Sequence, residues 1–195
     1  MGDAAARVKM TPEEYLAFER ASDVKHEYVD GEIFAMSGGS YEHSLLASNI
    51  ARELGNALVD RPCDVHGSDM KIRVLASNRF FYSDVSVICG SPIFADEIRD
   101  SVVNPKVIVE VLSDSTERYD RGEKFGHYRR LDSLQDYVLV SQTEPLVEQF
   151  SRQADGTWLY RALGPADTLV LASLGCSIPV ERIYLKVFRP TSNPG

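Results

Sequence analysis

Two acidic residues stand inside the most apolar stretches of the sequence. Glu110 interrupts the Val, Ile and Leu residues of 106–112, and Asp84 lies within the strand-like segment 82–88. A buried, ionised carboxylate costs several kcal/mol unless a cation, hydrogen bonds or a metal ion compensates it. If the two segments are neighbouring strands, the carboxylates converge on one point and require a divalent cation or a shared proton between them.

This pair of carboxylates is suited to a divalent metal ion. Magnesium takes one or two carboxylates together with water and substrate phosphate oxygens, and the main-chain carbonyl of Val111 could add a ligand. A metal ion held in this way activates water for phosphodiester hydrolysis. A second explanation stays open, because Asp84 and Glu110 could each pair with a buried Arg or Lys, or accept main-chain hydrogen bonds at a strand end.

Three residues at intervals of four follow Glu110 on the next predicted helix: Asp120, Lys124 and Tyr128. Residues at this spacing share one helix face. A helix that leaves directly from the Glu110 strand packs back across the sheet, so this face could direct Lys124 at the metal site as a ligand for phosphate or water. The alternative is an exposed Asp120–Lys124 ion pair above a core contact of Tyr128, which would contribute little.

Glu27 and His43 are two further candidates. Glu27 precedes the hairpin signal Asp30-Gly31, and it could be another metal ligand or could position water. His43 stands at the start of a long helix, where it could act as a base or could only cap the helix and pack.

The elements that must position these residues follow from hydrophobic periodicity, caps and turns. We predict helices at Pro12–Glu19, His43–Val59 (capped by Ser40) and Glu117–Leu131. We predict a hairpin around Asp30-Gly31 and strands at Met70–Leu75, Phe80–Ile88, Lys106–Leu112 and Asp136–Ser141, then a meander through Leu146–Ser151, Trp158–Ala162 and Thr168–Ala172 and a short element near Ile183. The core order is helix, three strands, helix, strand. This order predicts an α/β fold with a mixed sheet flanked by helices, an N-terminal hairpin and a C-terminal β meander.

Length and composition indicate one globular domain. The chain has 195 residues, of which 44% are hydrophobic and 26% charged, and we expect a domain at 11–189 between flexible tails at 1–10 and 190–195. No apolar run is long enough to cross a bilayer. Since the N-terminus also lacks the apolar stretch of a signal peptide, we expect a cytoplasmic protein.

Charge, cysteines and absent motifs narrow the function. The formal net charge of −8 means that any contact with nucleic acid must come from a local basic surface or from metal ions. Cys63, Cys89 and Cys176 are too few and too scattered for a disulfide framework or zinc site, which predicts free thiols. The sequence contains no phosphate loop, dinucleotide fingerprint, nucleophile elbow or zincin motif, which disfavours those chemistries.

Several of these segments together resemble the Uma-two (Uma2) family of bacterial restriction-endonuclease-like proteins. The similarity runs from about Thr11 to Leu185, and it is most specific in Val107–Thr116, Tyr119–Lys124, Tyr128 and Asp136–Val140, with weaker support from Glu27–Ile33, His43 and Tyr82–Val87. The resemblance implies the restriction-endonuclease-like fold of the PD-(D/E)XK nuclease superfamily.

By this resemblance, Asp84 is the motif Asp and Glu110 the acidic residue of the (D/E)-x-K part. Ser83 stands where the superfamily often has Pro. Leu112 occupies the expected Lys position, on the same strand face as Glu110. Other members of the superfamily supply this lysine from the next helix, and Lys124 is the candidate here.

The sequence therefore predicts an endodeoxyribonuclease that uses Mg²⁺ or Mn²⁺ and acts on DNA. Asp84 and Glu110 bind the metal, Lys124 stabilises phosphate charge or orients water, and Glu27 assists. A homodimer would supply two sites for two DNA strands. The alternatives are a weak or inactive nuclease-fold module that binds a mobile element or a partner protein, as Leu112 and the net charge of −8 suggest, and a structural protein with buried ion pairs.

Overall fold

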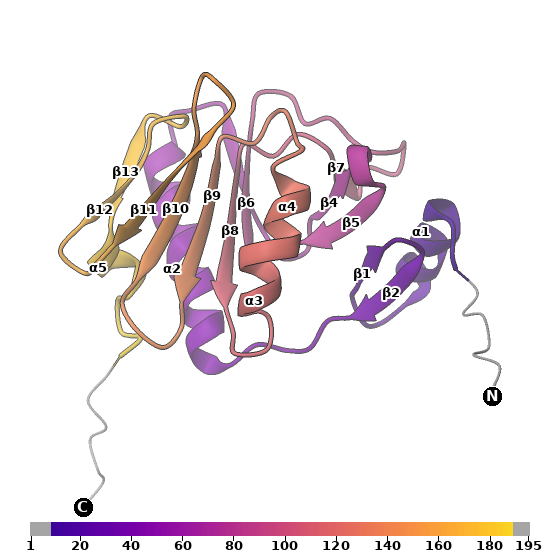
Figure 1. The fold of residues 1–195 in the computed structure, drawn as a ribbon, viewed down its shortest axis with the longest axis horizontal. Helices are drawn as coiled ribbons and strands as arrows, with labels where there is room; N and C mark the ends of the chain where they lie inside the picture. Colours follow the sequence, from indigo (N-terminus) through magenta and orange to yellow (C-terminus); the bar gives the residue numbers. More distant parts are fainter. Residues whose placement is uncertain (1–8, 189–195) are drawn as a thin grey trace, which may run out of the picture.

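The computed structural model describes residues 9–188, which form two main β-sheets and their covering helices (Figure 1). The larger sheet, in the order β11-β10-β9-β8-β6-β3, contains β3 (Cys63–Gly67), β6 (Val85–Cys89), β8 (Val107–Leu112), β9 (Asp136–Ser141), β10 (Val147–Arg152) and β11 (Trp158–Leu163). The smaller sheet, in the order β2-β1-β5-β4-β7, contains β1 (His26–Val29), β2 (Glu32–Ala35), β4 (Lys71–Val74), β5 (Arg79–Tyr82) and β7 (Ser101–Val102). A separate pair is formed by β12 (Thr168–Leu171) and β13 (Cys176–Pro179).

Helices cover both faces of the larger sheet, and the first helix packs against β1 of the smaller sheet. The helices are α1 (Pro12–Ala21), α2 (Tyr41–Leu58), α3 (Glu117–Tyr119), α4 (Phe125–Tyr128) and α5 (Val180–Ile183), with a π-helical turn, η2 (Asp120–Lys124), between α3 and α4 and a 3₁₀ turn, η1 (Leu75–Ser77). In Figure 1, α2 lies behind the sheet and α3–α4 lie in front of it. Every residue of β8 is buried between these layers, which is why its sequence is a nearly continuous apolar run.

Local sequence signals explain the first elements. The Thr11 hydroxyl and the Glu14 carboxylate form the predicted capping box of α1. The β1–β2 hairpin turns through Asp30 and Gly31, which both have positive φ, as a tight Asp-Gly turn requires. Ser40 caps α2 by accepting a hydrogen bond from the main-chain nitrogen of His43 (3.0 Å). The first two predicted helices and the predicted hairpin are therefore confirmed, as is the α/β fold class.

The predicted single strand Phe80–Ile88 is wrong. The chain forms β5 up to Tyr82 and β6 from Val85, and these two strands belong to different sheets. Asp84 therefore lies at the point where the chain passes from the smaller sheet to the larger one. The predicted strand Met70–Leu75 corresponds to β4 in the smaller sheet, so the three core strands between α2 and α3 are β3, β6 and β8.

β3, which the sequence analysis misses, also corrects the prediction for the cysteines. It pairs with β6 so that Cys63 lies opposite Cys89, and these two residues form a disulfide. Cys176 is a free thiol, as predicted. Disulfides persist mainly in oxidising compartments, so the cytoplasmic location stays a prediction.

The predicted helix Glu117–Leu131 is interrupted rather than continuous. Its middle, η2, is a π-helical turn, a feature often found at functional sites. The Tyr137 hydroxyl of β9 donates a hydrogen bond to the main-chain carbonyl of Asp120 (3.0 Å). This bond gives the widened turn a partner from the neighbouring strand, and both Asp120 and Lys124 in that turn are buried.

Residues 1–8 and 189–195 lie outside the described part of the chain, and with them most of the two predicted tails. The described end of the first tail is anchored, since the nitrogen of Met10 donates to the carbonyl of Gly31 (2.9 Å) and its carbonyl accepts from the Tyr28 hydroxyl (2.8 Å). Between residues 9 and 188, no helix is long and apolar enough to span a bilayer.

Candidate active site

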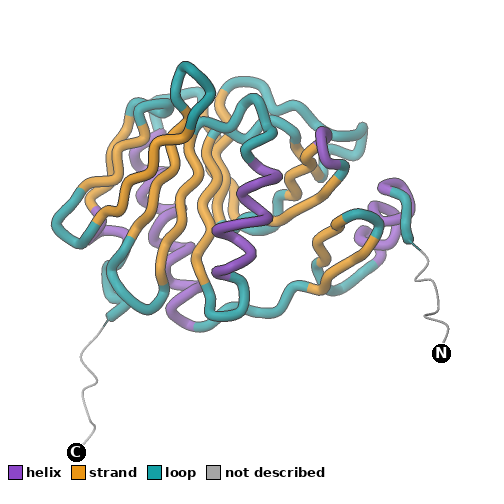
Figure 2. Tube along the Cα trace, viewed as in Figure 1, coloured by secondary structure: helices purple, strands orange, loops and turns teal. Residues whose placement is uncertain are grey.

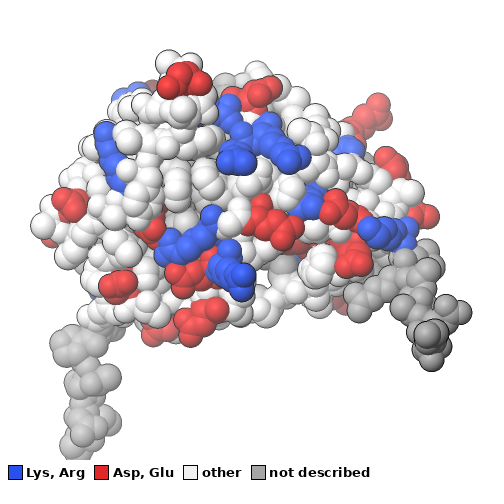
Figure 3. All heavy atoms as spheres, in the orientation of Figure 1, with Lys and Arg blue, Asp and Glu red and all other residues white. Residues whose placement is uncertain are grey.

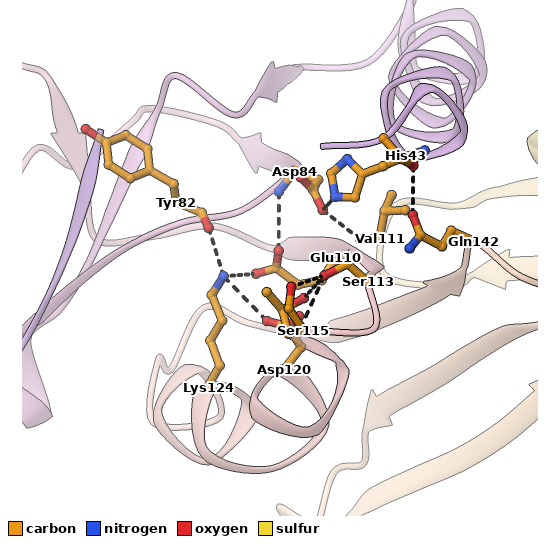
Figure 4. Close-up of polar contacts among 12 residues, drawn as sticks. His43, Tyr82, Asp84, Glu110, Val111, Ser113, Ser115, Asp120, Lys124 and Gln142 are labelled. Atoms are coloured by element: carbon orange, nitrogen blue, oxygen red, sulfur yellow. Dashed lines mark hydrogen bonds and ion pairs between the residues drawn. The ribbon is translucent and has the colours of Figure 1, made fainter. Parts of the chain in front are cut away.

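A cleft of about 1320 Å³ opens where the two sheets meet. Its walls come from the hairpin, the start of α2, the end of β8 and the turns that follow it. The loop from β2 to α2, seen in Figure 2 as a long connection, lines the cleft with Ser37, Gly38 and Gly39. Asp84 and Glu110 lie at the floor of the cleft, and the side chains around them are drawn in Figure 4.

The pairing of β6 with β8 brings the two carboxylates together. The strands are antiparallel with Val85 opposite Val109. Asp84 precedes Val85 and Glu110 follows Val109, so these two residues are also opposite each other. The nitrogen of Asp84 donates to Oε2 of Glu110 (3.4 Å), and the nitrogen of Val111 donates to Oδ2 of Asp84 (2.7 Å). The predicted convergence of Asp84, Glu110 and Val111 is therefore present.

Lys124 reaches the same site from η2. Its Nζ lies 3.0 Å from Oε1 of Glu110, 3.0 Å from Oε1 of Glu27 and 3.7 Å from Oδ1 of Asp120. It also donates a hydrogen bond to the carbonyl of Tyr82 (3.0 Å). Burial favours loss of the proton, but the carboxylates of Glu110, Glu27 and Asp120 together raise the pKa of Lys124 well above its ordinary value. Lys124 is therefore a fixed positive charge and not a proton acceptor at neutral pH.

Burial disfavours the charged forms of two acidic side chains around Lys124, Glu110 and Asp120. Burial raises the pKa of Glu110 well above its ordinary value, and the neighbouring carboxylates of Asp120, Asp84 and Glu27 add to the rise while Lys124 opposes it. Burial also raises the pKa of Asp120. Extra positive charge at this point would relieve both effects.

Leu112 and Tyr128 complete the surroundings of Lys124. Leu112, where the sequence resemblance leads us to expect a lysine, is buried in the apolar cluster between the sheet and α4. It lies on the same face of β8 as Glu110. Tyr128 is buried with its ring centre 6.0 Å from Nζ of Lys124, and burial followed by the charge of Glu110 raises the pKa of its hydroxyl. Lys124 thus places a positive charge beside Glu110 from the helical segment, whereas Leu112 on the strand carries none.

His43 contacts Asp84 from the first turn of α2. Its Nε2 lies 3.3 Å from Oδ2 of Asp84. The hydrogen bond to Asp84 raises the pKa of His43 against the effect of burial, and a hydrogen bond to the carbonyl of Val111 adds to the rise. His43 therefore contacts both the side chain of Asp84 and the main chain of Val111.

The carbonyl of Tyr82 and the side chain of Gln142 are contributors that the sequence analysis misses. Gln142 follows β9, and its Oε1 accepts a hydrogen bond from the Ser40 hydroxyl at the cleft (3.0 Å). Since β8 and β9 are parallel, their carboxyl ends meet at one sheet edge, and this signal could have indicated Gln142. The Tyr82 carbonyl had no such signal, because side-chain patterns do not reveal main-chain ligands.

The donor set is too small to hold a metal ion with side chains alone. Among residues 9–188, no three His, Cys, Asp or Glu side chains gather as a metal site. Two carboxylates and one carbonyl are nevertheless the oxygen donors that magnesium takes when water and substrate fill its other positions.

Comparison with known proteins identifies the fold and the family of this chain. The fold matches the crystal structure of a "putative nuclease belonging to DUF820" from Anabaena variabilis, with a TM-score of 0.74, 16% identity and coverage of 92% of this chain and 99% of that one. The chain belongs to the Uma2 family, described as "Putative restriction endonuclease", whose model matches residues 12–181.

Two relatives come from Synechocystis sp., and both are described as uncharacterized proteins. The protein slr1290 is 40% identical over 90% of this chain and 92% of its own length, and sll1609 is 38% identical over 79% and 87%. The predicted family and nuclease-like fold are thus confirmed, while the roles of the site residues stay predictions.

Proposed function

We propose that this chain is a PD-(D/E)XK-type endonuclease that hydrolyses DNA phosphodiester bonds with the help of Mg²⁺ or Mn²⁺. The observation that carries the proposal is the meeting of Asp84, Glu110 and Lys124 at the floor of one cleft, with Lys124 Nζ 3.0 Å from Glu110. Membership of the Uma2 family and the nuclease-like fold support the same reading.

Asp84, Glu110 and the carbonyl of Val111 would hold the metal ion. The fit rests on the carboxylate of Glu110, which is buried beside Asp84 and already attracts one cation, Nζ of Lys124 at 3.0 Å from its Oε1, and on the raised pKa of that carboxyl, which burial causes. When bound, the metal ion supplies a Lewis acid that activates water and offsets phosphate charge.

The remaining residues of the site stabilise charge on the phosphate or hold other side chains in position. Lys124, held charged by three carboxylates, stabilises the negative charge that develops on the phosphate. Glu27 and Asp120 fix the position of its ammonium group, and His43 orients Asp84. One copy of the chain provides one such site, so a homodimer would cut both strands of a duplex.

A second candidate is a nuclease-fold module that binds DNA or a protein partner without cleaving. It is favoured by the ion pairs that already engage Lys124 and by the net charge of −8. Under this alternative, the site could bind a metal ion but would not release Lys124 to a phosphate.

Nicking of supercoiled plasmid in Mn²⁺ separates the two candidates. We expect nicking by the natural chain and strong reductions in Asp84→Ala, Glu110→Ala and Lys124→Ala. Asp114→Ala, at an exposed position that also lines the cleft, is the matched control and should nick normally. Equal nicking by every variant would indicate a contaminating nuclease and reject the proposal, and metal binding without nicking would support the module.

A further inference from the structure

The cleft itself is poorly suited to attract a polyanion. Its described lining includes seven Asp and Glu residues but two lysines, Lys25 and Lys124, and Lys124 is already paired. A protein that binds DNA through its phosphates needs a basic surface. If the proposed function is correct, that surface must lie beside the cleft.

Such a surface lies on the solvent side of α3 and α4. Figure 3, in the same view as Figure 1, shows Lys and Arg side chains over both ends of these helices, with Asp and Glu side chains beside them. We define the arginine strip as Arg118, Arg121, Arg129 and Arg130, of which Arg118, Arg129 and Arg130 are exposed. Arg121 pairs with Glu117 and Glu148, whereas no described acidic residue forms an ion pair with the other three.

The strip continues directly from the cleft. Asp114 lines both the cleft and a shallow hollow whose wall includes Arg118 and Arg121. Arg118 lies in α3, and Arg129 lies eleven residues later in the turn that follows α4. At the rise of an α-helix, eleven residues correspond to roughly 16 Å. Phosphates of one DNA strand advance about 3.4 Å along the axis per nucleotide, so the two ends of the strip are about five nucleotides apart.

We propose that the arginine strip binds the phosphate backbone of double-stranded DNA and presents it to the cleft. This inference rests on the proposed function and names the surface that the substrate occupies. Exposed arginines along a helix contact phosphates without reading bases, so binding by the strip is independent of sequence. Its affinity depends steeply on salt because each phosphate contact releases counterions.

Fluorescence anisotropy with a 20-base-pair duplex tests the strip without cleavage. The background is Asp84→Asn, and the pair Arg129→Glu/Arg130→Glu is compared with Arg99→Glu/Arg161→Glu, which changes charge equally at exposed positions elsewhere. We expect the strip variant to raise Kd about tenfold or more and to reduce the slope of log K against log salt by about 2, while the control changes neither.

Equal weakening by the two double variants, or no weakening by the strip variant, overturns the inference. A second variant, Arg118→Glu, should lower the slope by about 1, and an unchanged slope counts against the strip. If the strip variant loses binding and the natural chain fails to nick plasmid, the DNA-binding role of the strip is supported and the proposed nuclease activity is rejected. If the natural chain nicks plasmid and the strip variant binds DNA unchanged, only the DNA-binding role of the strip is rejected.

Discussion

Two buried carboxylates on neighbouring parallel strands, Glu110 on β8 and Asp136 on β9, have opposite surroundings. Each residue is 3% exposed. Asp136 accepts hydrogen bonds from Gln149 (2.9 Å), from the Ser151 hydroxyl (2.6 Å) and from the Ser173 hydroxyl (2.8 Å). Glu110 instead faces a lysine and three other acidic groups at the floor of a cleft.

The difference shows how burial alone fails to identify a functional acid. Three neutral donors form hydrogen bonds with the two oxygens of Asp136 and solvate its charge. Glu110 instead has a cation, Lys124, as its partner at 3.0 Å and lies beside like charges, which favours further positive charge. We therefore expect replacement of the carboxylate by an amide to reduce activity at Glu110 and stability at Asp136.

Glu110→Gln should have the largest effect. It removes one negative ligand while keeping shape, so we expect plasmid nicking to fall by about 10²-fold or more. Unfolding by urea should show little loss of stability, because the substitution removes a carboxylate that burial penalises. A variant that nicks normally would remove Glu110 from the mechanism.

Lys124→Met should reduce nicking by about 10²-fold, since the charge on the phosphate loses its partner. Mn²⁺ binding should persist, because Asp84 and Glu110 remain. Three carboxylates lose their cation, so the free energy of unfolding should fall by about 3–5 kcal/mol without metal. Calorimetry with Mn²⁺ separates the two roles, and a variant that neither binds metal nor refolds with it would contradict this assignment.

Asp136→Asn should affect stability and not activity. The new amide group faces donors that previously bonded a carboxylate, and we expect a loss of about 1–3 kcal/mol in the free energy of unfolding. Nicking per folded molecule should be unchanged. A specific loss of nicking at full stability would break the comparison with Glu110.

The smallest effect concerns His43. Its pKa is raised by the hydrogen bond to Asp84, so the pair stabilises the fold fully below about pH 6.5 and loses this contribution as pH rises through the raised value. Asp84→Asn should lower the pKa of His43, measured by NMR titration. The signal of His127, whose pKa is lowered by burial and by Arg79 rather than by a contact with Asp84, is the control and should not move.

The sequence predicts Glu110 because a charged residue in an apolar strand is conspicuous. Asp136 does not stand out, since it opens its strand and its partners Gln149, Ser151 and Ser173 come from distant segments. The helix spacing of Asp120, Lys124 and Tyr128 also indicates their shared face, although the π-helical turn between α3 and α4 depends on a contact with Tyr137.

The hydrophobic pattern of the sequence does not predict where β5 ends, where β6 begins or which strand pairs with β6. Ser83 and Asp84 separate β5 from β6, but apolar residues on both sides hide the change of sheet. β3 is a half-exposed edge strand without a clear alternation, so its pairing with β6 and the disulfide between Cys63 and Cys89 become visible only in three dimensions.

Mn²⁺ titration calorimetry on Glu110→Gln and Asp136→Asn shows which of the two buried acids binds a metal ion. We expect the natural chain and Asp136→Asn to bind the ion with similar affinity, and Glu110→Gln to bind it much more weakly. Undiminished binding by Glu110→Gln would contradict the claim that this acid and Asp84 hold a shared cation.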